Sequence, residues 1–93
     1  MKIIINGTYG GFGVTDTLLA HLGAEDSWDI DRTNPDLVWA VEHLEAHEVN
    51  GRFADLRVAE IPDESTDWVI EEYDGLEKVM YVLDGKIHWT YGI

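Results

Sequence analysis

The chain has 93 residues, of which 45% are hydrophobic, and 19 acidic side chains outnumber six basic ones to give a net charge of −13. This charge argues against direct binding to nucleic acid or to anionic membranes, since both require Lys and Arg. The absence of cysteine excludes disulfides and thiolate chemistry. The apolar content suffices for one domain over residues 1–93, and no apolar stretch has the length of a membrane span or signal peptide, so we expect a cytoplasmic protein.

The first quarter of the chain predicts a strand, a glycine-rich loop and a short helix. Residues 2–5 are apolar and rich in β-branched side chains, which predicts a central strand. Four glycines within residues 7–13 predict a flexible loop. Thr15 is a suitable N-cap for a helix that ends at Gly23, a favourable residue for the position after a helix.

A polar connector over residues 24–34 precedes a second predicted helix. The Asn-Pro-Asp sequence at 34–36 supplies an N-cap, a proline at the first helical position and an acid near the positive helix end. The apolar stripe continues the helix to about Val49, and the Asn-Gly pair at 50–51 ends it.

The second half of the chain predicts strands over residues 56–61, 68–73, 79–83 and 87–91. The last three are separated by two Asp-Gly pairs, at 74–75 and 84–85, which are strong signals for two-residue hairpin turns. The predicted class is α+β, with an antiparallel sheet of about four to five strands and two helices packed on one face.

The glycine-rich loop resembles a phosphate-binding loop in its position between a strand and a helix. It lacks the required residues, because Asp16 occupies the last glycine position of the dinucleotide pattern and no Lys-Ser or Lys-Thr follows. The aromatic residues Tyr9 and Phe12 are therefore either tucked inward or offered to a partner.

No catalytic or metal-binding pattern is complete. His43 and His47 have the spacing of two zinc ligands, but Leu44 stands where a zinc protease has its general base, and no third ligand is evident. Adjacent carboxylates are common in so acidic a chain, and neighbouring residues of a strand point to opposite faces. We expect no enzyme activity, no metal and no cofactor; a small hydrolase or metal protein is the least favoured alternative.

The distribution of acids is the most informative feature. Residues 58–77 contain no Lys or Arg, and a second acidic run, 25–36, contains Arg32 alone. Aromatic and aliphatic residues interleave both runs, which predicts carboxylates held on a rigid frame, and such an array can compete for a basic groove. The alternative is an acidic face that only keeps the protein dispersed. The predicted partner-binding carboxylates are Glu60, Asp63, Glu64, Asp67, Glu71, Glu72, Asp74 and Glu77.

Three segments, KIIINGTYGGFG, NGRFADLRVAEIPD and WVIEEYDGLEKV, resemble a group of small acidic bacteriophage and prophage proteins. The resemblance implies a protein acting in the host bacterial cell, where some small acidic phage proteins are anti-CRISPR inhibitors. Effector complexes expose basic surfaces that hold nucleic acid. We therefore expect an inhibitor that covers a basic host protein or ribonucleoprotein surface. The alternative is a phage modulator that binds a host enzyme or transcription component without nucleic-acid mimicry.

Overall fold

A computed structural model describes residues 1–92 and confirms the α+β class. The first half holds β1 (Lys2–Asn6), α1 (Asp16–Leu22), the short 3-10 helix η1 (Ser27–Asp29), α2 (Pro35–His43) and α3 (Ala46–Val49). The second half holds β2 (Leu56–Glu60), β3 (Asp67–Tyr73), β4 (Leu76–Leu83) and β5 (Lys86–Thr90). Within the described residues, no helix has the length and apolar character needed to cross a membrane.

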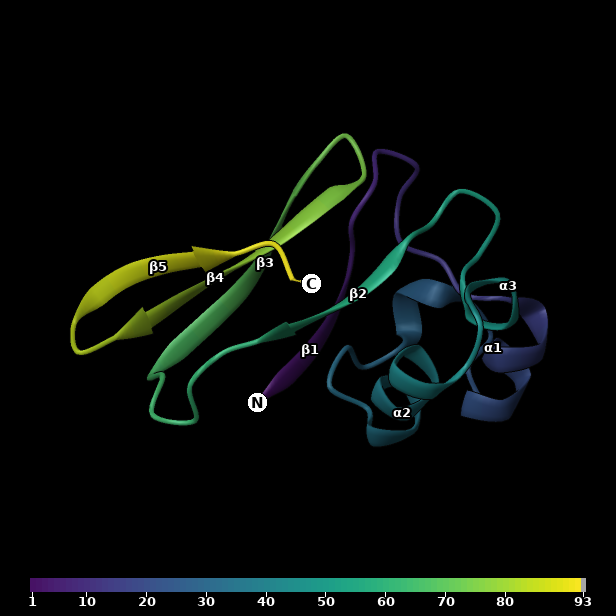
Figure 1. Ribbon diagram of the computed structural model, residues 1–93, viewed down its shortest axis with the longest axis horizontal. Helices are drawn as coiled ribbons and strands as arrows, with labels where there is room; N and C mark the ends of the chain where they lie inside the picture. Colours follow the sequence, from purple (N-terminus) through teal and green to yellow (C-terminus); the bar gives the residue numbers. More distant parts are fainter. Residues whose placement is uncertain (93) are drawn as a thin grey trace.

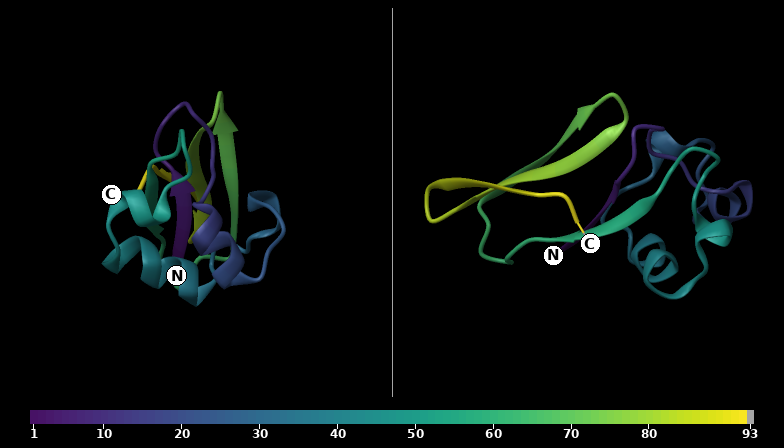
Figure 2. Two further views of the ribbon diagram at one scale, coloured as in Figure 1. Left: turned by 90° about the vertical axis from the view of Figure 1, so that its right-hand side faces the viewer. Right: turned by 45° about the horizontal axis from the view of Figure 1, so that its top comes forward.

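The strands form two antiparallel sheets instead of the single sheet expected from the sequence. β1 pairs with β2, and β3, β4 and β5 form a separate sheet with β4 at its centre. β1 and β2 lie between the helices and the three-stranded sheet (Figure 1), and the right-hand view of Figure 2 keeps this order. The expected sheet with two helices is thus replaced by two sheets and three α-helices.

Strand β1 joins two hydrophobic cores because its alternate side chains point to opposite faces. Ile4 packs among helix residues that include Leu37. Ile3 and Ile5 point the other way and pack in a second core with Val79 of β4. Burial on both faces explains why residues 3–5 form an uninterrupted apolar run.

Both predicted hairpin turns are confirmed. Asp74 and Gly75 have φ angles of 52° and 91°, and Asp84 and Gly85 have φ angles of 54° and 75°. Positive φ at both central residues is the type I′ turn that joins two strands with the correct twist. The caps of α1 are also as predicted, since the Thr15 side chain accepts from a first-turn N–H and Gly23 is left-handed.

The second helix is shorter than predicted and breaks at Leu44, which has extended backbone angles. Glu45 then begins α3 with a capping box to Glu48. The break has a tertiary cause: Val49 follows Leu37 by three and one-third helical turns, so an unbroken helix would direct the two side chains about 120° apart. Both are buried in the same core in the structure.

Candidate functional site

The eight predicted carboxylates do not form one compact patch. Four exposed residues in or beside the β2–β3 connection form what we call the acidic corner: Glu60, Asp63, Glu64 and Asp67. Three exposed residues at the far end of β3 form what we call the hairpin acids: Glu71, Glu72 and Asp74. The nearest members of the two groups, Asp67 and Glu71, are four residue steps apart on β3, which is about 13 Å at the usual strand rise.

Glu77 is the exception, because it is buried and corrects the prediction that it contacts a partner. Its side chain forms a two-bond ion pair with Arg32, at 2.8 and 2.9 Å, and accepts the Asn6 N–H at 2.8 Å. A buried carboxylate is stable only with such partners. The Arg32 guanidinium also lies 3.5 Å from the centre of the Phe12 ring, so the half-buried Phe12 belongs to this internal cluster.

The acidic corner is held in place by short contacts around the N-terminus. The Met1 ammonium group donates to the Asp63 carboxylate at 2.7 Å, and this hydrogen bond lowers the pKa of Asp63. An Asp67 oxygen accepts the Trp68 N–H at 2.9 Å. The side-chain carboxylates of Glu60 and Glu64 make no hydrogen bond or ion pair within residues 1–92, and Glu60 lies across the β1–β2 pair from Lys2.

The hairpin acids border a second feature, which we call the aromatic hollow. Its volume is about 470 Å³, and its lining consists of Tyr9, Glu71, Glu72, Tyr73, Leu76, Lys78 and Tyr91. The Glu71 carboxylate accepts the Trp89 indole N–H at 2.9 Å and lies 3.9 Å from the Lys78 ammonium. The Glu72 carboxylate accepts the Gly75 N–H. Both carboxylates are therefore fixed in position beside exposed aromatic rings.

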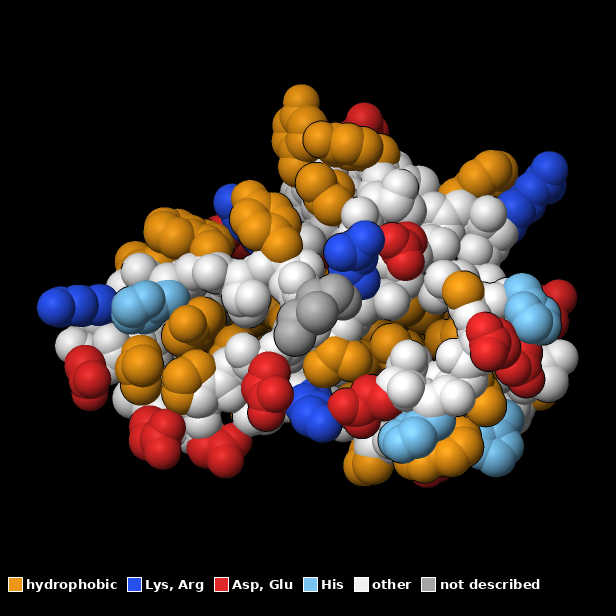
Figure 3. All heavy atoms as spheres, viewed as in Figure 1, with side chains coloured by type: hydrophobic (Ala, Val, Ile, Leu, Met, Phe, Trp, Pro, Cys, Tyr) orange, Lys and Arg blue, Asp and Glu red, His pale blue; other side chains and the backbone are white. Residues whose placement is uncertain are grey.

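Apolar side chains also cover the outer face of the three-stranded sheet. The strand registers place Val69, Met80 and Trp89 on one face, opposite the face that packs on β1 and β2. Val69, Ile87 and Trp89 are exposed. Hydrophobic side chains gather over β3–β5 in Figure 3. This apolar face was not predicted from the sequence. The presence of apolar residues on both faces of the predicted hairpins could have indicated it.

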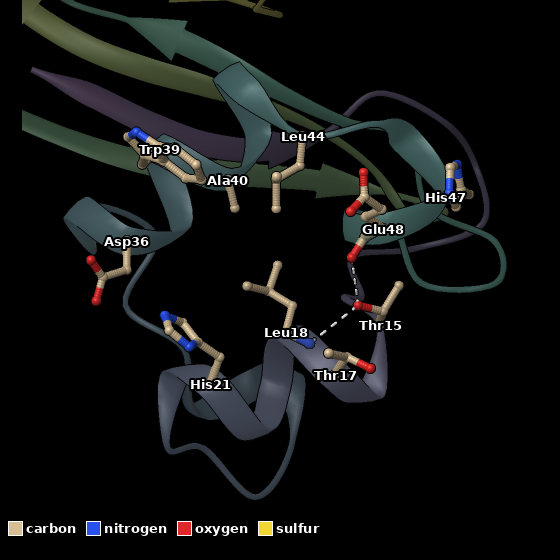
Figure 4. Close-up of a pocket in the computed structure, with 10 residues that line it drawn as sticks. All are labelled: Thr15, Thr17, Leu18, His21, Asp36, Trp39, Ala40, Leu44, His47 and Glu48. Carbon is tan, nitrogen blue, oxygen red and sulfur yellow. Dashed lines mark hydrogen bonds between the residues drawn. The ribbon is translucent and has the colours of Figure 1, made fainter.

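A groove of about 550 Å³ lies beside α1, α2 and α3. Leu18, Ala40 and Leu44 project toward its centre from different helical segments (Figure 4). Polar side chains surround this apolar floor, and no Lys or Arg is among them. The other lining residues are Thr15, Thr17, His21, Asp36, Trp39, His47 and Glu48.

In the described part of the chain, the histidines in and beside the groove are not grouped as metal ligands. Among the described residues, no group of three or more His, Cys, Asp or Glu is placed to hold a metal ion. His43 and His47 belong to different helices because of the break at Leu44, so the zinc-ligand spacing seen in the sequence does not correspond to one helical face. His43 instead stacks on Trp39, with ring centres 4.8 Å apart.

The chain matches no protein-family model, no curated protein and no solved structure. The candidate sites are therefore the exposed surfaces of the molecule itself. These are the acidic corner, the hairpin acids with the aromatic hollow, and the helical groove.

Proposed function

We propose that this chain is a phage-encoded inhibitor of a host defence complex, acting in the bacterial cytoplasm as an anti-CRISPR-like binding protein. It works by occupancy, covering a basic nucleic-acid-binding surface with its own carboxylates, and needs no catalytic group or cofactor. The observation that supports this most is the exposure of seven carboxylates, four in or beside the β2–β3 connection and three at the far end of β3.

A rigid strand is a suitable frame for such an inhibitor. The separation of about 13 Å between the nearest acids of the two groups is close to the rise of about four base pairs of duplex DNA, at 3.4 Å each. Effector complexes bind guide, target and displaced strands in positively charged channels. Negative charge at both ends of β3 would steer the protein to such a channel and speed association.

The decisive experiment compares two charge-reversal variants with the same net charge. One reverses three residues of the acidic corner: Glu60→Lys, Glu64→Lys and Asp67→Lys. The matched control reverses three exposed acids near η1: Glu25→Lys, Asp26→Lys and Asp29→Lys. Each changes the net charge by six, from −13 to −7. The measurement is inhibition of target-DNA binding by a purified CRISPR effector, with folding checked by circular dichroism.

We expect the acidic-corner variant to lose inhibition by at least tenfold, because reversal adds like-charge repulsion to the loss of attraction. The η1 control should stay within a few-fold of the unmodified protein. Equal inhibition by all three proteins would show that the acidic corner is only a solvated surface. A similar loss in both variants would mean that net charge, and not this surface, controls binding.

The helical groove favours a second candidate function, in which the protein modulates a host enzyme or transcription component without mimicking nucleic acid. An apolar floor of Leu18, Ala40 and Leu44 suits the apolar face of a partner helix, as in other helix-in-groove complexes. Leu44→Lys would place a charge in this groove. In a pull-down from host lysate, loss of a partner from this variant but not from the acidic-corner variant would favour the second function.

A further inference from the structure

We propose that the aromatic hollow receives an arginine side chain of the partner, so that recognition depends on arginine and not on positive charge alone. This inference rests on the proposed function and names the chemistry of one of its contacts. The hollow combines exposed tyrosine rings with fixed carboxylates. A surface that attracts its partner by charge alone would need the carboxylates but not the rings.

The protein contains an internal example of the same recognition. Arg32 lies between the Phe12 ring, 3.5 Å from its guanidinium carbon, and the Glu77 carboxylate, which it contacts through two hydrogen bonds. Arg32 thus stacks the plane of its guanidinium group on a ring and donates two hydrogen bonds from the edge of that group to a carboxylate. The aromatic hollow offers the same two groups: Glu71 and Tyr73 lie two residues apart and therefore on one face of β3, and the Tyr9 ring also lines the hollow.

The lining of the hollow contains a single basic residue, Lys78. The Lys78 ammonium lies 5.6 Å from the Trp89 ring centre and 5.8 Å from that of Tyr91. Within residues 1–92 no cation lies over Tyr9 or Tyr73, although these rings are 63% and 78% exposed. Two carboxylates face one ammonium group in the lining, so the hollow stays negative and complements a further cation.

Arginine fits the aromatic hollow better than lysine. Its guanidinium group stacks on aromatic rings, donates two parallel hydrogen bonds to a carboxylate and is more weakly hydrated than an ammonium group. Stacking of a cation on one exposed ring changes the affinity by about two- to fivefold, so two rings together account for about a tenfold change. The prediction is therefore a preference for arginine over lysine at equal charge.

The test uses two peptides, nine arginines and nine lysines, with binding measured by calorimetry at 0.15 M NaCl. The test variant is Tyr9→Ala/Tyr73→Ala, which keeps every charge. The control is Trp28→Ala, which removes an aromatic side chain that is 86% exposed and lies on η1, outside the hollow. We expect about tenfold tighter binding of the arginine peptide, with this preference abolished in the double variant and kept in the control.

Two results would overturn the inference: equal affinity for both peptides, or an arginine preference that survives the loss of both tyrosines. Neither result contradicts the proposed function, which requires only a basic partner and is decided by the effector assay. Failure of both peptides to bind, together with no inhibition of any effector, would contradict the inference and the proposed function together.

Discussion

At the scale of single residues, buried polar groups connect segments that are distant in the chain. Asn6 is fully buried, and its side-chain amide donates to the carbonyls of Thr8 and Gly75, at 2.6 and 2.7 Å. Its side-chain oxygen accepts the Asp55 N–H at 2.8 Å. One side chain therefore joins the glycine-rich loop, the β3–β4 turn and the start of β2, while the Asn6 backbone N–H contacts Glu77.

The Arg32–Glu77 pair predicts a large loss of stability when one partner is removed. In Glu77→Gln the Arg32 charge stays half-buried without its counterion, which costs about 3 kcal/mol of unfolding free energy. The matched control is Glu71→Gln, since Glu71 is exposed and 3.9 Å from Lys78, and it should cost less than about 1 kcal/mol. Urea denaturation measures both. Similar small losses in the two variants would show that the buried pair contributes no more than a surface pair.

A second residue-scale prediction concerns the pKa of Asp63. The Met1 ammonium group donates a hydrogen bond to this carboxylate and lowers its pKa below the ordinary value. The contact therefore stabilises the fold above the pKa of Asp63 in the unfolded chain, and this stabilisation is lost as the pH falls through the lower, folded pKa. An NMR titration should show the lowered value, and acetylation of the N-terminus should restore it. The control is Asp31, whose pKa is lowered by the Thr33 N–H and should not respond to acetylation.

At the scale of elements, the two hairpin turns have the same backbone geometry but different surroundings. A Cβ atom on Gly75 would lie 2.4 Å from the Tyr9 carbonyl oxygen and 2.5 Å from the Gly11 nitrogen, whereas a Cβ on Gly85 would meet nothing within 4 Å. The β3–β4 turn is therefore packed against the glycine-rich loop, and the β4–β5 turn is open.

Alanine substitutions in the two turns distinguish the cost of backbone strain from the cost of steric crowding. Gly85→Ala should cost about 1 kcal/mol, because positive φ is unfavourable for any residue with a Cβ. Gly75→Ala carries the same strain and must also displace backbone atoms of the loop, so it should cost at least about 2 kcal/mol more. Thermal or urea unfolding of the two variants measures the difference. Equal losses would mean that the glycine-rich loop moves away at no cost.

Local chemistry explains which elements could be predicted from the sequence. The Asp-Gly turns and the Thr15 and Gly23 caps depend on neighbouring residues, and the structure confirms them. The break at Leu44 and the division into two sheets depend on contacts between distant residues, such as Val49 with Leu37, which no local pattern contains.

In the candidate site, too, the sequence predicts what depends on a single residue and not what depends on a distant partner. Seven acids of the segment 58–77 are exposed as expected, because charged side chains are seldom buried without a partner. Glu77 is buried because Arg32, 45 positions earlier, supplies that partner, and the sequence carries no sign of this pairing. The aromatic hollow likewise depends on the glycine-rich loop packing on the β3–β4 turn, a contact between the two ends of the chain.

At the scale of the whole molecule, β1 lies between two hydrophobic cores and contributes side chains to both. Its odd-numbered isoleucines pack toward the three-stranded sheet, and Ile4 packs toward the helices. The molecule is elongated, 40 × 26 × 22 Å, and the outer face of the three-stranded sheet is exposed. The hairpin acids and the aromatic hollow lie on this sheet, so the proposed binding surface is on the side of the molecule opposite the helices, which pack with Ile4 in the first core.

The net charge of −13 predicts that the folded protein is more stable in salt. Among the described residues, ion pairs engage only Glu42, Asp55, Asp63, Glu71 and Glu77, so most of the 19 carboxylates repel one another across a small surface. NaCl shortens the range of this repulsion from about 30 Å at 0.01 M to about 10 Å at 0.1 M. Unfolding separates the charges, so screening favours the folded state. We expect the melting temperature to rise by several degrees between these concentrations, since about 1 kcal/mol corresponds to roughly 4–8 °C in a domain of this size. The Glu25→Lys/Asp26→Lys/Asp29→Lys variant should rise by less, and a flat or falling response in the unmodified protein would show that its carboxylates are too far apart to destabilise it.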